Sequence, residues 1–325
     1  MSKTISVLLT LLGSLLLATQ TFAAAPAAPI TGSNKLPWAG CGISKNAFMG
    51  EMVQAYEKKT GVKVELLGGG ATKGIRQVSN KEVQLGGTCR HVLEKENSLT
   101  HDEERRVQLT PVAWDALVVI THKDNPVNSL TLDQLRGIYK GRITNWKEVG
   151  GKDAPIELYV RTGKISGVGR TLRELMFYNY DEEFVAKHVR EESATLEKDM
   201  VTNPNGMGVT GVSSANKIKN IAKILKLEGK EPSFDNIKTG QYLLYRPLYL
   251  VSKLDERDPE VKKFHDFVRG EEGKAIMRKV GTVPYEDGVN LWLTYLDQQN
   301  KALANRLKVD DVGPNKKGKT ATAKK

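Results

Sequence analysis

Apolar residues recur along this chain at two spacings, one typical of helices and one typical of strands. In the segment 46–59 they fall on one helical stripe, made by Phe48, Met49, Met52, Val53 and Tyr56. The segment 62–67 (VKVELL) alternates as a strand does, and the short run 82–87 (EVQLGG) predicts a second strand. A glycine turn and a helix start lie between the two strands. Loops, helices and strands in this order indicate an α/β fold.

Two long apolar runs bracket the middle of the chain. Segments 111–123 (PVAWDALVVITHK) and 242–253 (YLLYRPLYLVSK) are rich in branched and aromatic residues and predict buried strands. Further elements are expected as follows: a helix from Thr131, a strand at 155–161, a helix at 167–177 with a polar helical stretch to about 198, a turn and strand at 203–212, and helices near 259–280 and 290–307.

The length of the chain favours two lobes. With 325 residues it exceeds the size at which one core usually keeps growing. The two long strands predict a first lobe built from both ends of the sequence, 33–112 with 250–307. The second lobe, 113–249, is then inserted between the two crossings.

The N-terminus predicts a signal peptide over residues 1–24. Lys3 precedes an apolar run at 5–18 that is too short to span a bilayer, and small residues follow at 23–25. No other stretch of the sequence is apolar enough to cross a membrane, so we expect an exported mature chain, periplasmic or secreted. Cys41 lies more than twenty residues beyond the apolar run, which argues against a lipid anchor there.

The net charge of +11 is concentrated partly at the C-terminus. Residues 308–325 hold six Lys and two Asp, have no periodicity, and predict a disordered basic tail. Because basic and aromatic residues do not interleave in the rest of the chain, we expect no nucleic-acid partner.

Five stretches together resemble a known family. They are AYEKKTGVKVE (55–65), GGGATKGIRQV (68–78), LTLDQLRGIYKGRITNWKEVGG (130–151), NPNGMGVTGV (203–212) and YRPLYLVSK (245–253). In wording and order they are similar to periplasmic substrate-binding proteins of type II architecture, most closely the phosphate-binding proteins of ABC transporters. The resemblance covers roughly 33–307. It implies a two-lobed α/β fold with two crossing hinge strands, a monomer that holds an anion between its lobes, and an ABC permease as partner.

Three loops in the order of this family each open into a helix. Free N–H groups at helix starts, with Ser and Thr hydroxyls, can replace the water around a tetrahedral oxyanion without a full counter-charge. Glycine lets the backbone approach the ligand closely. The candidate ligand-binding residues are Ser44, Lys45, Gly70, Ala71, Thr72, Thr88, Arg90, Arg161, Ser166, Gly167 and Thr171.

The sequence departs from the family at the position that recognises the proton of the ligand. The resemblance implies an aspartate near GGTCRH that accepts the proton of phosphate, but Cys89 stands at or beside that place. The third loop is also longer, with Val168 where a Ser is expected. We therefore expect binding of phosphate or a related oxyanion with weak discrimination against sulfate.

The chain has only two cysteines, Cys41 and Cys89. The resemblance places both at the cleft ends of neighbouring elements, and exported compartments oxidise such pairs, so we expect a disulfide. A soft-metal or redox pair is the alternative. The five histidines show no paired spacing, and we expect neither a metal site nor a cofactor.

Two other classes of function differ from solute capture: a sensing or docking domain, and an enzyme. A degenerate binding domain used for sensing or docking would agree with a pocket that departs from the family pattern and with a basic tail. An enzyme is not expected, because the sequence has no Ser-His-Asp signature, metal-ligand cluster or nucleophile elbow.

Overall fold

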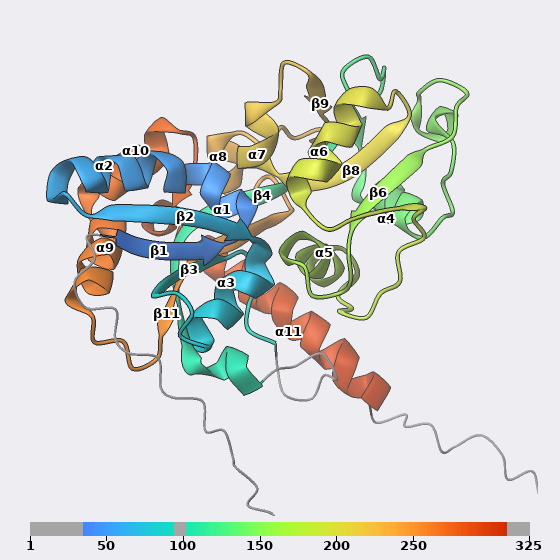
Figure 1. Ribbon diagram of the computed structural model, residues 1–325. Helices are drawn as coiled ribbons and strands as arrows, with labels where there is room; N and C mark the ends of the chain where they lie inside the picture. The colour runs from blue at the N-terminus through green and yellow to red at the C-terminus, as the bar shows by residue number, and fades with distance from the viewer. Residues whose placement is uncertain (1–34, 94–101, 311–325) are drawn as a thin grey trace, which may run out of the picture. The chain divides into compact units, whose positions relative to one another are not determined.

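The computed structural model of the chain describes residues 35–93 and 102–310 (Figure 1). The predicted signal peptide and the last fifteen residues of the predicted tail, 311–325, lie outside this part. The helix α11 (Leu291–Asp310) extends into the segment 308–325 that the sequence predicts as disordered. None of the helices in the described part is both long and apolar enough for a membrane span.

The strands form one large mixed sheet and a small second one. The large sheet has the order β2-β1-β3-β11-β4-β8-β6-β7, with β9 and β12 also paired to β4, and β5 pairs with β10. The strands are β1 (Lys35–Gly40), β2 (Lys63–Gly69), β3 (Leu85–Thr88), β4 (Val107–His122), β5 (Ser129–Leu130), β6 (Glu157–Arg161), β7 (His188–Arg190), β8 (Gly206–Gly211), β9 (Ala222–Ile224), β10 (Lys226–Leu227), β11 (Tyr245–Lys253) and β12 (Val283–Pro284).

Helices follow most of the strands, as expected for an α/β fold. Figure 1 places α2 and α10 on one side of the blue strands β1 and β2, and α3 on the other. The remaining α-helices are α1 (Gly42–Ser44), α2 (Gly50–Thr60), α3 (Gly70–Ser79), α4 (Leu132–Tyr139), α5 (Gly167–Leu172), α6 (Ser193–Thr202), α7 (Val212–Lys217), α8 (Phe234–Lys238), α9 (Pro259–Arg269) and α10 (Glu271–Lys279). Turns of π-helix at Lys45–Met49 and Arg173–Phe177 extend α1 into α2 and lengthen α5.

The two long predicted strands are real and lie side by side. β4 pairs antiparallel with β11 from Val107↔Lys253 to Ala116↔Tyr245, and beyond that point it pairs with β8 and β9. Through β11, the first part of β4 is joined to the parallel strands β1, β2 and β3. Through β8, its last part is joined to the parallel strands β6, β7 and β8. A strand pair that links two parallel groups is what a two-lobed fold with crossing hinge strands requires.

Tight packing holds α3 against the first group of strands. A Cβ on Gly74 of α3 would lie 2.4 Å from the backbone oxygen of Gly87 and 2.9 Å from that of Ala39, so only glycine allows this approach. On β1, the ring of Trp38 is fully buried and lies over Gly40 and Gly87. The ends of β1 and β3 are therefore rigidly placed beside the N-terminus of α3.

Two details of the sequence prediction are wrong. No strand is predicted before the helix at 46–59, but residues 35–40 form β1, because a six-residue strand with a Pro gives little pattern. The polar stretch up to about 198 is not one helix: the helical turn ends at Tyr178, in the left-handed region with φ 50°, and irregular chain and β7 follow before α6. A local turn is favoured over a continued helix there, because the Asn179 side chain accepts a hydrogen bond from the backbone N–H of Asp181.

Candidate functional site

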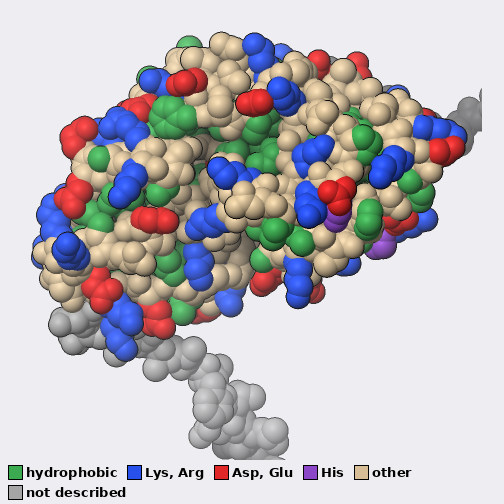
Figure 2. All heavy atoms as spheres, turned by 90° about the horizontal axis from the view of Figure 1, so that it is seen from above, with side chains coloured by type: hydrophobic (Ala, Val, Ile, Leu, Met, Phe, Trp, Pro, Cys, Tyr) green, Lys and Arg blue, Asp and Glu red, His purple; other side chains and the backbone are tan. Residues whose placement is uncertain are grey.

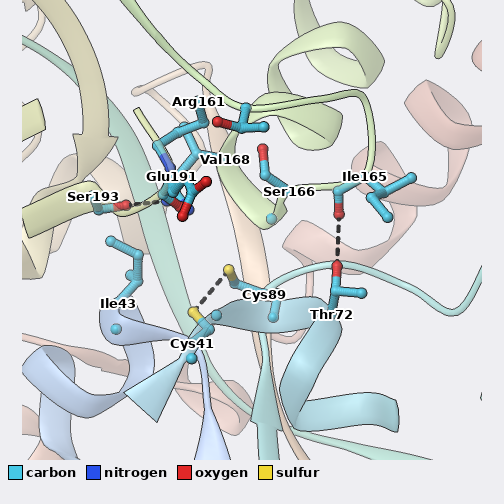
Figure 3. A pocket seen from close by; sticks show the side chains of 16 residues that line it. Cys41, Ile43, Thr72, Cys89, Arg161, Ile165, Ser166, Val168, Glu191 and Ser193 are labelled. Atoms are coloured by element: carbon cyan, nitrogen blue, oxygen red, sulfur yellow. Dashed lines mark hydrogen bonds between the residues drawn. The ribbon is translucent and has the colours of Figure 1, made fainter. Parts of the chain in front are cut away.

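A pocket of about 190 Å³ lies where three strands end. Cys41 follows β1, Cys89 follows β3, and Arg161 is the last residue of β6 (Figure 3). The helices α1, α3, α5 and α6 each begin with a residue that lines the pocket: Gly42, Gly70, Gly167 and Ser193. Several helix N-termini, whose N–H groups favour negative charge, thus converge on one small space.

Six of the predicted ligand-binding residues line this pocket. They are Gly70, Ala71, Thr72, Arg161, Ser166 and Gly167. Gly70 and the preceding Gly69 have φ values of 89° and 114°, which side chains rarely adopt, so glycine is required where α3 opens to the pocket. Ser166 caps α5 by accepting a hydrogen bond from the backbone of Gly169.

The other five predicted residues do not line the pocket. The guanidinium of Arg90 is buried and donates to both carboxylate oxygens of Glu104, at 2.9 Å each, and to the backbone of His91 and Ile165. Its charge is therefore neutralised by Glu104, an ion pair the sequence did not reveal. The side chains of the other four residues donate to acceptors within the protein. Thr88 donates to Arg90 O and Thr171 donates to Gly167 O. Ser44 donates to Cys41 Sγ and Lys45 donates to Leu66 O.

Among the described residues that line the pocket, Arg161 is the basic side chain. Nη1 donates to Ser193 Oγ at 2.6 Å, Nε donates to the backbone oxygen of Arg190 at 3.2 Å, and Nη2 donates to the backbone oxygen of Glu191. These acceptors are neutral and fix the guanidinium in place without cancelling its charge. Burial lowers the pKa of Arg161, and the nearby cysteines and acidic residues act in the opposite sense.

Arg246 lies beneath the pocket and was not predicted. It is fully buried on β11, and its Nη1 donates to Gly167 O at 2.8 Å and to Cys89 O at 3.3 Å. Nη2 lies 3.7 Å from Asp115 Oδ2, and Nε and Nη2 make no hydrogen bond within the described residues. Burial raises the pKa of Asp115, although Arg246 and Ser213 oppose this. The signal missed was an arginine in an otherwise apolar strand.

The two cysteines meet in the wall of the pocket. Both are buried free thiols, and their sulfur atoms lie 2.8 Å apart. Burial raises the pKa of Cys41, but the Cys89 thiol, Arg246 and Ser44 together lower it to about 6. The pKa of Cys89 is raised well above its usual value, first by its hydrogen bond to Cys41 and then by burial. The two pKa shifts have opposite directions, so Cys41 is the sulfur of the pair that ionises more readily.

Hydrogen bonds join the two groups of strands around the pocket. Thr72 on α3 donates to Ile165 O at 3.1 Å and accepts from Arg90 Nη2 at 3.0 Å, while Arg90 Nε also donates to Ile165 O. Figure 2 shows Lys and Arg side chains beside a hollow on the face of the molecule that it draws. Among the described residues, no three His, Cys, Asp or Glu side chains gather as a metal site would require.

A family model described as the PBP superfamily domain matches residues 43–272. The phosphate-binding protein PstS of Borreliella burgdorferi is 28% identical over 258 residues, which cover 77% of this chain and 90% of that protein. The PstS proteins in this comparison are named for phosphate binding and not for an enzymatic activity, as the sequence analysis expects.

Solved structures give the same relationship. A putative phosphate ABC transporter substrate-binding protein with bound phosphate from Clostridium perfringens has a TM-score of 0.68 and 28% identity, covering 77% of this chain and 99% of that one. An ABC-type phosphate transport receptor from Vibrio cholerae has a TM-score of 0.58 and 27% identity, covering 76% and 99%. The α/β fold is that of type II periplasmic binding proteins. With its family model spanning most of the described residues, the chain belongs to the PBP superfamily.

Proposed function

We propose that this chain is an exported solute-binding protein that captures a small oxyanion, phosphate or a relative, and delivers it to an ABC permease. The observation that carries the proposal is the pocket in which α1, α3, α5 and α6 begin around the guanidinium of Arg161. Similarity to proteins named for phosphate binding supports the ligand class, and similarity to ABC transporter components supports the permease.

The chemistry of the pocket suits a desolvated anion. Backbone N–H groups at helix starts and the Ser166 hydroxyl offer donors, and Arg161 adds one full positive charge. The ligand is held between a lobe made of 33–112 with 250–307 and a lobe made of 113–249. These lobes close about β4 and β11 when the anion binds, as a hinge.

Export and cysteine oxidation belong to the same proposal. Residues 1–24 direct the chain to the periplasm or the exterior, where Cys41 and Cys89 are oxidised to a disulfide. Edman sequencing of the protein from its native host and a count of free thiols after unfolding test these two points. An intact N-terminus or two free thiols would contradict them.

Calorimetric titration with phosphate, sulfate and molybdate tests the proposed function. Saturable binding of at least one of these oxyanions is expected, with poor discrimination between phosphate and sulfate. Binding of none of them would end the proposal and favour a sensing or docking role.

A further inference from the structure

Cys41 and Cys89 are held together by the backbone at the edge of the pocket. β1 and β3 pair in parallel with Gly40 opposite Gly87, and the N–H of Cys41 donates to Gly87 O at 3.0 Å. Figure 3 shows both sulfur atoms directed toward the pocket. The opposite wall approaches Cys89 closely, because a Cβ on Gly167 would lie 2.4 Å from Cys89 Sγ. A change in the oxidation state of the two sulfur atoms therefore affects both walls of the pocket.

The reduced pair places a negative charge in this wall. The groups that face Cys41 are the Cys89 thiol, Ser44 on α1 and Arg246 on β11, and Arg161 on β6 interacts with it across the pocket. Cys41 also stands at the N-cap of α1, and its sulfur receives hydrogen bonds from the Cys89 thiol and the Ser44 hydroxyl, so these surroundings favour the thiolate and lower the pKa of Cys41 to about 6. The positive charge of Arg246 already interacts with Asp115. A thiolate at Cys41 offsets this positive charge further, so less of it acts on an anion in the pocket.

Oxidation removes that charge without removing the side chains. The Cys41 thiolate attacks an external disulfide, which gives a mixed disulfide and releases one thiolate. Cys89 then attacks the Cys41 sulfur, which forms the S–S bond between the two cysteines and releases the second thiolate. The Cys89 proton is released to solvent. The external disulfide has gained two electrons and has left as two thiolates. The wall changes from a thiolate and a thiol to a neutral disulfide, so Arg246 no longer faces a thiolate.

We propose that Cys41 and Cys89 form a redox gate of the anion pocket, in which the disulfide form binds the oxyanion and the dithiol form binds it weakly. This inference rests on the proposed function. A unit charge a few ångströms from a bound anion in a partly buried site changes affinity by about 10-fold to 100-fold.

The test compares the full chain in its two redox states. One sample is oxidised with oxidised glutathione and one is kept in dithiothreitol, with the state of each verified by thiol count and intact mass. Phosphate and sulfate are titrated calorimetrically into both, and thermal unfolding verifies that both are folded. The matched control is the double variant Cys41→Ser with Cys89→Ser, which keeps side chains of similar size but cannot carry the thiolate charge.

The expected result is that the oxidised protein binds at least about tenfold more tightly than the reduced one. The double variant should bind with the same affinity with and without dithiothreitol. Equal affinity in the two redox states, or tighter binding by the reduced protein, would overturn the gate and leave the proposed function standing. Failure of the oxidised protein and of the double variant to bind any oxyanion would overturn both.

Discussion

Nη1 of Arg246 donates a hydrogen bond to the backbone oxygen of Gly167, 2.8 Å away. This contact joins β11, which pairs with β3 and β4, to the first residue of α5. The same guanidinium lies 3.7 Å from the buried carboxylate of Asp115. One buried side chain thus links the sheet beneath the pocket to a helix that forms its wall.

Replacing Arg246 should destabilise the fold. Arg246→Met leaves the Asp115 carboxylate buried beside no positive charge, which should lower the free energy of unfolding by about 3 kcal/mol. Chemical denaturation measures this, and the double variant with Asp115→Asn should recover part of the loss. An unchanged unfolding free energy in the single variant would show that the pair contributes no net stability.

Replacing Arg161 should weaken anion binding with little effect on stability. Arg161→Gln keeps hydrogen-bond donors near Ser193 but removes the positive charge from the pocket, so oxyanion affinity should fall by about 10-fold to 100-fold. Calorimetric titration measures the change. Arg142→Gln, at an exposed arginine that does not line the pocket, is the matched control. Equal losses in the two variants would indicate a non-specific effect of net charge.

The sequence predicted the backbone of the site better than its charges. Gly70, Ser166 and Gly167 were predicted at the pocket that they line, because glycine or a capping hydroxyl before a helix is a local signal. The ion pair of Arg90 was not predicted, because its partner, Glu104, lies in the segment after 94–101 and follows no pattern that sequence periodicity detects. Long-range ion pairs are set by the fold and leave no local trace.

The strand pattern had similar strengths and limits. The long apolar runs behind β4 and β11 were predicted, since fully buried strands give continuous hydrophobic stretches. β1 was not, because its six residues are too few to establish an alternation. Arg246 was missed for a related reason: an isolated arginine in an apolar strand has no meaning until the neighbouring Asp115 is placed.

The hydroxyl of Thr72 should contribute to binding through the contact that it makes across the pocket. Thr72→Val removes the hydrogen bond to Ile165 O and leaves Arg90 Nη2 with one acceptor fewer. Oxyanion binding should weaken by on the order of 1 kcal/mol, because the walls of the pocket are then joined less strongly. Calorimetry measures this against Thr60→Val, whose hydroxyl donates to Tyr56 O within α2. A similar loss in both variants would refute a specific role for Thr72.

Glu174 should make the fold less stable as the pH rises. Burial raises the pKa of this carboxyl from 4.5 to about 7, so the folded state binds a proton that the unfolded state releases. Its contribution is fully favourable below about pH 4.5 and is lost as the pH rises to about 7, on the order of 3 kcal/mol. Burial lowers the pKa values of His91 and His265 to about 4, which acts in the opposite sense.

The comparison of wild type with Glu174→Gln isolates this carboxyl from the histidines. The variant should gain stability relative to wild type between pH 4.5 and 7, measured by denaturation at several pH values. A difference between the two proteins that does not change with pH would contradict a raised pKa.

Hydrogen exchange with and without saturating phosphate tests the central claim most directly, because it reports where the anion binds. If helix starts hold the ligand, phosphate should slow exchange in the segments 41–43, 69–72, 165–168 and 191–193, which contain residues that line the pocket. The segments of α9 and α10 should be unaffected. Protection that is absent from all four segments, or that appears only elsewhere in the chain, would contradict the account.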